Sequence, residues 1–193
     1  NIDKVISNYL SKNIKFSDEN IFAAKLSLLD TLGCVYNAST YDDPMRFATR
    51  DVYGANTNPF NVLGDMQSSS EMARYFSILT RWFDYNDTFL AEEWAHPSDN
   101  IGTAFAYFTN HKEKNISEFL QSIIQMYEIQ GCLALGTSLN KKGYDHVFYV
   151  KLASGAVYSS LLSDQNPESI SRTVNNVLQD GVNLRSYRQA PNV

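Results

Sequence analysis

The sequence predicts an all-α fold, an irregular multi-helix bundle formed by one helical domain over residues 1–193. Apolar residues recur at helical spacing in nearly every segment, and capping side chains precede most of these segments. Alternating strand patterns are nearly absent, and the two weak strand candidates, residues 60–63 and 148–150, are short. The hydrophobic fraction of 44% suits a globular chain that buries a core without disulfides.

Eight helices are expected, each with apolar residues three or four positions apart. They cover, in order, about residues 2–10, 18–35, 43–53, 69–83, 101–108, 118–135, 146–161 and 167–178. The expected capping residues are Ser17, Asp43, Ser68 (with Glu71 in a capping box), Ser98 or Asp99, Ser117, Asp145 and Asn166. Gly54 and Gly181 suit helix ends, and residues 55–65 are interpreted as a loop because Asn, Pro and Gly interrupt them.

The net charge of −5 argues against a nucleic-acid or anionic-membrane partner, because both need clustered Lys and Arg. No apolar run approaches the roughly 18–20 residues of a membrane span, and no signal peptide opens the chain, so a cytoplasmic protein is expected. Cys34 and Cys132 lie in apolar helical patterns and are interpreted as small buried hydrophobes. Neither has a partner at ligand spacing, and no metal-binding motif is present, so no metal is expected.

The most informative segment, residues 84–100, reads DYNDTFLAEEWAHPSDN. Polar runs of this density on a rigid scaffold are where binding and catalytic groups concentrate. His96 and the carboxylates can supply both halves of a proton transfer. Pro97 biases His96 away from helical geometry, and Ser98 lies at a helix start that suits an anion. The alternative is that His96 is a structural residue and Ser98 only a cap.

Asp84, Asp87 and Thr88 follow the helix that is expected to end near residue 83. They either terminate that helix with turn hydrogen bonds, or orient an imidazole and accept substrate hydroxyl groups. His146 follows Asp145 at another helix start, where the helix dipole disfavours the imidazolium and leaves a base. No role is expected for the third histidine of the chain, in the charged loop after residue 110.

The C-terminal stretch from residue 181 to 193 carries Arg185, Tyr187 and Arg188 but no apolar period. We interpret this as a sign that the chain is the N-terminal part of a longer protein, the alternative being a frayed end.

These segments resemble, in order and over nearly the whole chain, the MmgE/PrpD family and within it the 2-methylcitrate dehydratase branch. The resemblance is carried by residues 28–34, 84–88, 93–100, 127–132, 143–154 and 184–192. It implies a two-domain enzyme, usually a homodimer without a cofactor, in which a large helical domain is completed by a lid. The lid and an active-site lysine of the family lie beyond residue 193, so we expect this chain alone to be inactive or nearly so.

The resemblance further implies a lyase that dehydrates 2-methylcitrate, a small polycarboxylate of propionate catabolism, to 2-methyl-cis-aconitate. His96 and His146 would share the acid and base roles, with Asp84 polarising one imidazole and Thr88 hydrogen-bonding the substrate or the nearby loop. The expected substrate-binding residues are Asp87, Ser98, Tyr187 and Arg188, the last a carboxylate contact. Two alternatives remain: another branch that acts on a related acid as a decarboxylase, isomerase or epimerase, or a non-catalytic helical interaction module.

Overall fold

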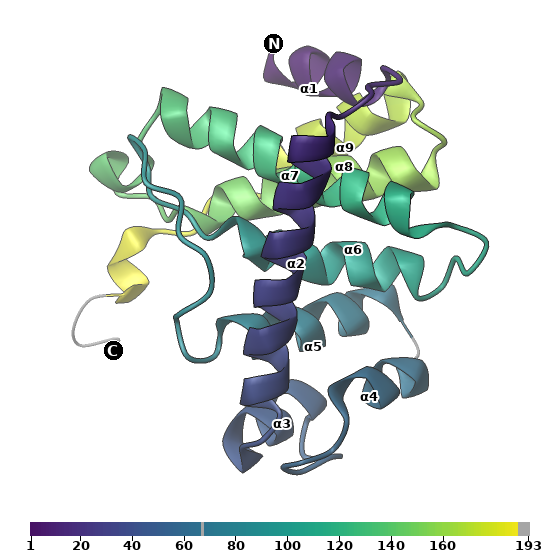
Figure 1. The fold of residues 1–193 in the computed structure, drawn as a ribbon. Coiled ribbons are helices and arrows are strands. Elements are labelled where there is room, and N and C mark those ends of the chain that lie inside the picture. Colours follow the sequence, from purple (N-terminus) through teal and green to yellow (C-terminus); the bar gives the residue numbers. More distant parts are fainter. Residues whose placement is uncertain (67, 189–193) are drawn as a thin grey trace. The chain divides into compact units, whose positions relative to one another are not determined.

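A computed structural model describes residues 1–66 and 68–188, and the structure is all-α as predicted (Figure 1). The helices of the described residues are α1 Ile2–Leu10, α2 Asp18–Ala38, α3 Asp42–Thr49, α4 Pro59–Asp65, α5 Ser69–Arg81, α6 Ile101–Phe108, α7 Ile116–Gly136, α8 Val147–Leu162 and α9 Pro167–Gln179. Short 3-10 turns cover Pro97–Asn100, Asn140–Lys142 and Arg185–Arg188. Within this part of the chain, β pairing is limited to two isolated bridges.

The described residues form two compact units. Unit 1 comprises Asn1–Lys15, Thr88–Pro97 and the chain from Gln125 onward, and unit 2 comprises Phe16–Asp87 and Ser98–Ile124. The expectation of a single helical domain over residues 1–193 stays a prediction.

Unit 1 is built on α8 and α9, which lie side by side and both contact α1 (Figure 1). Asp3 of α1 is buried in this packing, and its carboxylate accepts hydrogen bonds from Ser171 (2.6 Å) and Asn175 (3.3 Å) of α9. A second cluster of this unit contains Ala134, Leu139, Phe148 and Tyr149, against which the loop residue Phe89 packs. The loop that carries His96 therefore rests on a packed apolar surface.

Unit 2 is built on α5, which packs against α2, α3 and α6. Phe76 of α5 stacks on Phe105 of α6 with ring centroids 4.1 Å apart. Tyr75, which has no exposed surface, donates a hydrogen bond to the backbone oxygen of Pro59. Three of the predicted helix starts are confirmed, because the side chains of Ser17, Ser68 and Asn166 accept backbone N–H groups at the starts of α2, α5 and, in unit 1, α9.

Several predicted boundaries were wrong. The third helix starts at Asp42 rather than at an Asp43 cap and ends at Thr49, before Gly54, because Arg50 takes a left-handed conformation. The expected loop over residues 55–65 contains α4, which begins with Asn58 as its cap and Pro59 in its first turn. Residues 60–63 and 148–150 are helical and not strands, because they lie within α4 and α8, respectively.

Three further caps differ from the prediction. Helix α8 has His146 rather than Asp145 as its cap residue. Residues 97–100 form a 3-10 turn that runs into α6, so neither Ser98 nor Asp99 is its cap, and the cap residue is Asn100. The long helix α7 begins at Ile116, and Asn115 rather than Ser117 exchanges capping hydrogen bonds with Glu118.

The two cysteines are free, and only one of them is buried as expected. Cys34 is 4% exposed on the inner side of α2, whereas Cys132 lies on an exposed side of α7. Among the helices of the described residues, none has both the length and the apolarity needed to cross a membrane.

The close packing of α6 on α5 gives a testable prediction. A Cβ on Gly102 would lie 2.4 Å from the Ser77 side-chain oxygen and 2.9 Å from the Ala73 backbone oxygen. Because a backbone atom cannot move aside cheaply, we expect Gly102→Ala to lower the free energy of unfolding by about 1–3 kcal/mol in urea titrations. Gly64→Ala is the control: no atom lies within 4 Å of the added Cβ. An equal loss in both variants would contradict the packing argument.

Candidate active site

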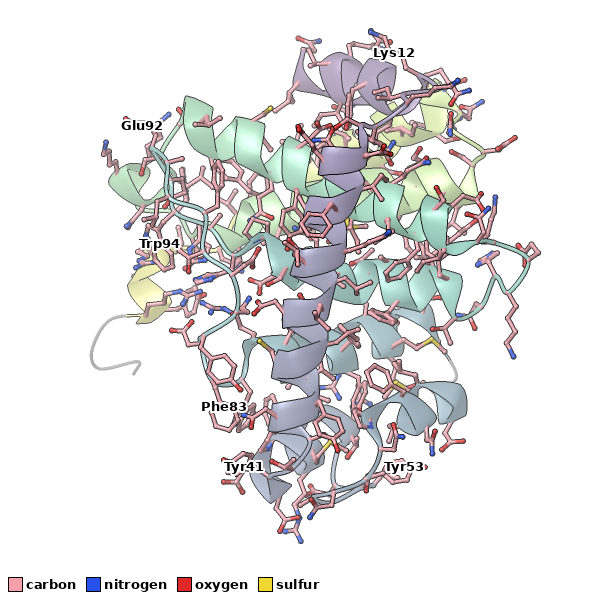
Figure 2. All side chains as sticks on the ribbon, viewed as in Figure 1. Lys12, Tyr41, Tyr53, Phe83, Glu92 and Trp94 are labelled. Carbon is pink, nitrogen blue, oxygen red and sulfur yellow. The ribbon has the colours of Figure 1, made fainter. Side chains whose placement is uncertain are left out.

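The loop of residues 88–97 is held in unit 1 by backbone pairing and by one buried carboxylate (Figure 2 labels Trp94 in this loop). Phe89 and Ala95 exchange two backbone hydrogen bonds of 2.8 and 3.0 Å. Glu93 has no exposed surface, and its Oε2 accepts the backbone N–H of Asn140 (2.7 Å) and the hydroxyl of Ser138 (3.2 Å). These contacts place the following residues, Trp94 and His96, against the start of α8.

Three aromatic rings meet at this position. The rings of His96 and His146 have centroids 6.1 Å apart, and Trp94 lies 5.5 Å from His96 and 4.3 Å from His146. His96 is 5% exposed and His146 is 1% exposed. The folded unit 1 therefore brings together the two histidines that the sequence singled out, although they lie fifty positions apart.

His146 is held in its neutral form. Burial, followed by the nearby charges of Arg188 and His96, lowers the pKa of His146 from its ordinary value of 6.5 to about 4, against the opposing effect of Asp145. The pKa of His146 is thus lowered, as predicted, but the main cause is burial rather than a helix dipole. Neither ring nitrogen of His146 has a hydrogen-bond partner among the described residues; Nδ1 lies 3.3 Å from Asp145 Oδ1 without bonding geometry.

Asp145, Arg185 and Arg188 lie beside the three rings and form a cluster with them. Asp145 organises the basic side of this cluster. Its buried carboxylate contacts Arg188 (Oδ2 to Nε, 2.5 Å) and Arg185 (Oδ2 to Nη1, 3.6 Å), and its Oδ1 accepts the Val147 backbone N–H (3.1 Å). Burial raises the pKa of Asp145, but the Val147 N–H and Arg188 outweigh it, and the pKa lies below its ordinary value. Asp145 is therefore an anion that holds two guanidinium groups in place.

Backbone pairing fixes the segment that carries these arginines. The Asp145 N–H donates to the Asn183 carbonyl, the Arg185 N–H donates to the Gly143 carbonyl, both at 2.8 Å, and Tyr144 and Leu184 form a β-bridge. The guanidinium of Arg185 lies 5.5 Å from the centre of the Trp94 ring, a cation–π arrangement. The two arginine side chains keep 24% and 32% of their surface exposed, so both remain open to an anion.

Of the other expected site residues, Tyr187 contacts the cluster through Arg188. Thr88 and Tyr187 are exposed, and Arg188 lies over the Tyr187 ring at 5.2 Å. In unit 2, Asp84 is exposed and forms an ion pair with Arg81, and Asp87 accepts the backbone N–H of Ser98 (3.0 Å).

Within unit 2, the Ser98 hydroxyl is buried and lies 2.7 Å from Asn86 Nδ2, which also donates to Asp99. The roles expected for Asp84, Asp87, Thr88 and Ser98 stay predictions.

Sequence reasoning missed three residues of the cluster. Trp94 was seen only as part of a motif, Asp145 only as a helix cap, and Arg185 only as part of the tail. Buried aromatic and charged neighbours of a histidine are typical of a tuned proton-transfer group. The position of Asp145 directly before His146 was the signal that could have identified it. Among the described residues, no group of three or more His, Cys, Asp or Glu side chains could hold a metal ion.

The lowered pKa of His146 predicts how the stability of the chain depends on pH. The unfolded imidazole binds a proton near pH 6.5, whereas the folded one does so only near pH 4. The contribution of the neutral, buried His146 to the free energy of unfolding is therefore fully present above about pH 6.5. It is lost as the pH falls toward 4. From pH 7 to pH 5 this group alone should lower the free energy of unfolding by about 2 kcal/mol.

Urea unfolding at both pH values measures this change in the wild type and in His146→Gln. The variant should lose about 2 kcal/mol less than the wild type over this range. His111→Gln is the matched control: the His111 ring stacks on Tyr107 in unit 2, outside the cluster, and this variant should keep the wild-type pH dependence. If the free energy of unfolding of His146→Gln fell between pH 7 and pH 5 as much as that of the wild type, His146 would not be the responsible group.

The fold and the cluster describe a helical domain with a histidine pair beside two arginines, an arrangement that can hold an anion and move a proton next to it. Residues 6–193 match the model of the MmgE/PrpD N-terminal domain. The chain belongs to the MmgE/PrpD family, as the sequence motifs indicated.

The curated relatives carry dehydratase names. The chain is 35% identical to a probable 2-methylcitrate dehydratase of Saccharomyces cerevisiae, over 100% of this chain and 40% of the relative. It is 35% identical to 2-methylcitrate dehydratase of Escherichia coli, over 99% of this chain and 41% of the relative. A mitochondrial 2-methylcitrate dehydratase of Yarrowia lipolytica is 36% identical over 100% and 40%. The chain thus spans about 40% of the length of these relatives.

Proposed function

We propose that the chain is the N-terminal helical part of a dehydratase that removes water from 2-methylcitrate or a close alkylcitrate. The observation that carries this proposal is the juxtaposition of His96 and His146, 6.1 Å apart, beside the two arginines that Asp145 holds. The dehydratase names of relatives that align with the whole chain support it. The cytoplasmic location stays a prediction, since one relative is named mitochondrial.

The reaction is an acid/base elimination. One group takes a proton from the carbon next to a carboxylate, another protonates the departing hydroxyl, the C–H and C–O bonds break, and a carbon–carbon double bond and water form. His96 and His146 share the two proton transfers. A neutral imidazole with a pKa near 4 is a weak base, but a bound polycarboxylate would raise that pKa, because its negative charge stabilises the imidazolium.

Substrate binding is assigned to the basic side of the cluster. Arg188 and Arg185 are partly exposed and presented in a fixed position, and guanidinium groups bind carboxylates with two parallel hydrogen bonds. Tyr187 is exposed next to Arg188 and is proposed as a further contact. Asp84 is proposed to polarise one imidazole, Thr88 to hydrogen-bond the substrate or the nearby loop, and Asp87 and Ser98 to bind the substrate. No cofactor is proposed.

The test is an assay of the full-length protein with a panel of citrate-like acids. We expect a new conjugated double bond, followed by ultraviolet absorbance, with 2-methylcitrate as the best substrate. Release of carbon dioxide or isomerisation without net loss of water would instead identify another branch of reaction. No turnover of any acid, with intact folding, would favour the alternative of a non-catalytic helical module.

The chain of 193 residues by itself is expected to be inactive or nearly so, because it covers about 40% of its relatives. A site that excludes water needs walls from the remaining sequence. Turnover by this chain at the full-length rate would refute that expectation.

A further inference from the structure

Glu93 is a buried carboxylate without the partners that such a group normally has. It has no exposed surface. Its Oε2 accepts the Asn140 backbone N–H (2.7 Å) and the Ser138 hydroxyl (3.2 Å), whereas its Oε1 has no hydrogen-bond partner among the described residues. No Lys, Arg or His side chain of this part of the chain forms an ion pair with it. A buried charge without a cation costs stability, so its presence requires an explanation other than stability.

The surroundings of Glu93 also hold the start of α8. The Glu93 backbone N–H donates a hydrogen bond to the Ala134 carbonyl at 2.9 Å. Ala134 and Tyr149 of α8 belong to one buried apolar cluster, and the Tyr149 hydroxyl donates to the Thr137 carbonyl at 3.0 Å. The end of α7 and the turn after it therefore hold both Glu93 and the first turn of α8, which begins directly after His146.

Trp94 connects Glu93 to His146 from the side of the loop. It follows Glu93 directly, and its ring lies 4.3 Å from the His146 ring (Figure 2 labels Trp94 and Glu92, the two neighbours of Glu93). Burial lowers the pKa of His146, and the negative charges of Asp145 and Glu93 oppose this effect. Burial and then the charge of Glu93 raise the pKa of the nearby tyrosine in the first turn of α8. The charge of Glu93 therefore acts on His146.

The two negative charges near His146 differ in their own partners. The groups whose charges act on His146 are Asp145, Arg188, His96 and Glu93. The Asp145 carboxylate lies against the guanidinium groups of two arginines, which neutralise its charge. Among the described residues, Glu93 has no such cation. Glu93 is therefore the negative charge near His146 that no cation compensates.

We infer that Glu93 is a positioning residue of the proposed reaction: it fixes the loop that carries His96 and supplies the negative charge that stabilises the imidazolium of His146. When His146 takes up a proton, a positive charge forms in a buried site, and a fixed anion nearby lowers the free energy of that form. Glu93 acts in this role through His146 rather than on the substrate. The inference rests on the proposed function, because it takes the proton transfer by His146 from there.

The test compares Glu93→Gln with Glu92→Gln in the full-length protein. Glutamine keeps the volume of the side chain and an oxygen acceptor for the Asn140 N–H, and it removes the charge. Glu92 is the matched control: it binds the same turn through Lys141 (3.0 Å), but its side chain is 60% exposed. NMR of isotope-labelled histidine follows the titration of His146, with His146→Gln to assign the signal. The pKa of His146 should fall by about 0.5–1 pH unit in Glu93→Gln and stay unchanged in Glu92→Gln.

Steady-state kinetics of the same variants give a second readout. The limb of the kcat–pH profile that belongs to His146 should move to lower pH in Glu93→Gln. Near neutral pH, kcat should fall roughly 3–10-fold with little change in KM, because a less basic imidazole is a weaker base and is less often protonated when it serves as the acid. Glu92→Gln should keep the wild-type profile.

Glu93→Asp separates the charge from the hydrogen bonds. Aspartate keeps the charge but is one methylene shorter, so this variant should unfold at a lower temperature while His146 titrates as in the wild type. Unchanged titration of His146 in Glu93→Gln, or an equal change in Glu92→Gln, would overturn the inference. So would a pKa of His146 that falls as far in Glu93→Asp as in Glu93→Gln. A wild type without dehydratase activity would overturn the proposed function, and the titration would still show whether Glu93 acts on His146.

Discussion

The full-length protein with His96→Ala is expected to turn over 2-methylcitrate at least ~100-fold more slowly than the wild type, because a positioned proton-transfer group is worth roughly 10²–10⁴ in rate. His96 is 5% exposed and lies in the ring cluster with Trp94 and His146, so its loss leaves no neighbour in the same position. Steady-state kinetics give the change in kcat, and thermal unfolding of the same preparation shows whether the fold survives. The midpoint of unfolding should change little.

His111→Ala is the control for this measurement, because His111 lies in unit 2 and its ring stacks on Tyr107 at 4.0 Å. Its activity should stay within a few-fold of the wild type. His96→Gln keeps the volume of the side chain and removes the titratable ring, so it should be as slow as His96→Ala. A variant that loses folding and activity together would instead support a structural role for His96.

Asp145→Ala should lower the free energy of unfolding by about 3 kcal/mol. Removing one partner of a buried ion pair typically costs 3–5 kcal/mol, since the remaining charge is left without compensation. Here the lower end applies, because the guanidinium groups of Arg185 and Arg188 are 24% and 32% exposed and can regain water. At this chain length the midpoint should fall by roughly 6–12 °C. Asp145→Asn keeps the acceptor for the Val147 N–H and should fall in between.

The matched control is Asp180→Ala, which removes an aspartate paired with Lys151 at the surface, where the two side chains are 72% and 40% exposed. Exposed ion pairs contribute little to stability, so the midpoint should stay close to that of the wild type. Similar midpoints for Asp145→Ala and Asp180→Ala would show that burial of Asp145 does not make its ion pairs important.

The helices were predictable where a local signal starts them. Ser17, Ser68 and Asn166 are capping residues in the sequence and in the structure, because a cap depends only on the next three residues. The missed helix α4 has the same Asn–Pro start as α9, at Asn58, but only seven residues follow it. A run that short gives too few apolar positions to distinguish a helix from a loop or a strand.

The two histidines of the candidate site could be predicted from the sequence, but their neighbours could not. His96 stands out in a dense polar loop, and His146 stands out beside an acidic residue at a helix start. Their neighbours Trp94 and Arg185 join them only through packing between segments far apart in the chain. A pattern within one segment carries no information about such contacts. For the same reason, the exposure of Cys132 on an apolar helix escaped prediction.

The chain passes between its two units in the middle of its most polar loop, at Pro97 and Ser98. Unit 2 is complete once Ile124 has been synthesised, whereas unit 1 also needs the residues from Gln125 onward. During synthesis on the ribosome, unit 2 can therefore fold while unit 1 is still unfinished. His96 then lies in an open segment until His146 and the arginines emerge, so these side chains come together only after unit 2 is able to fold.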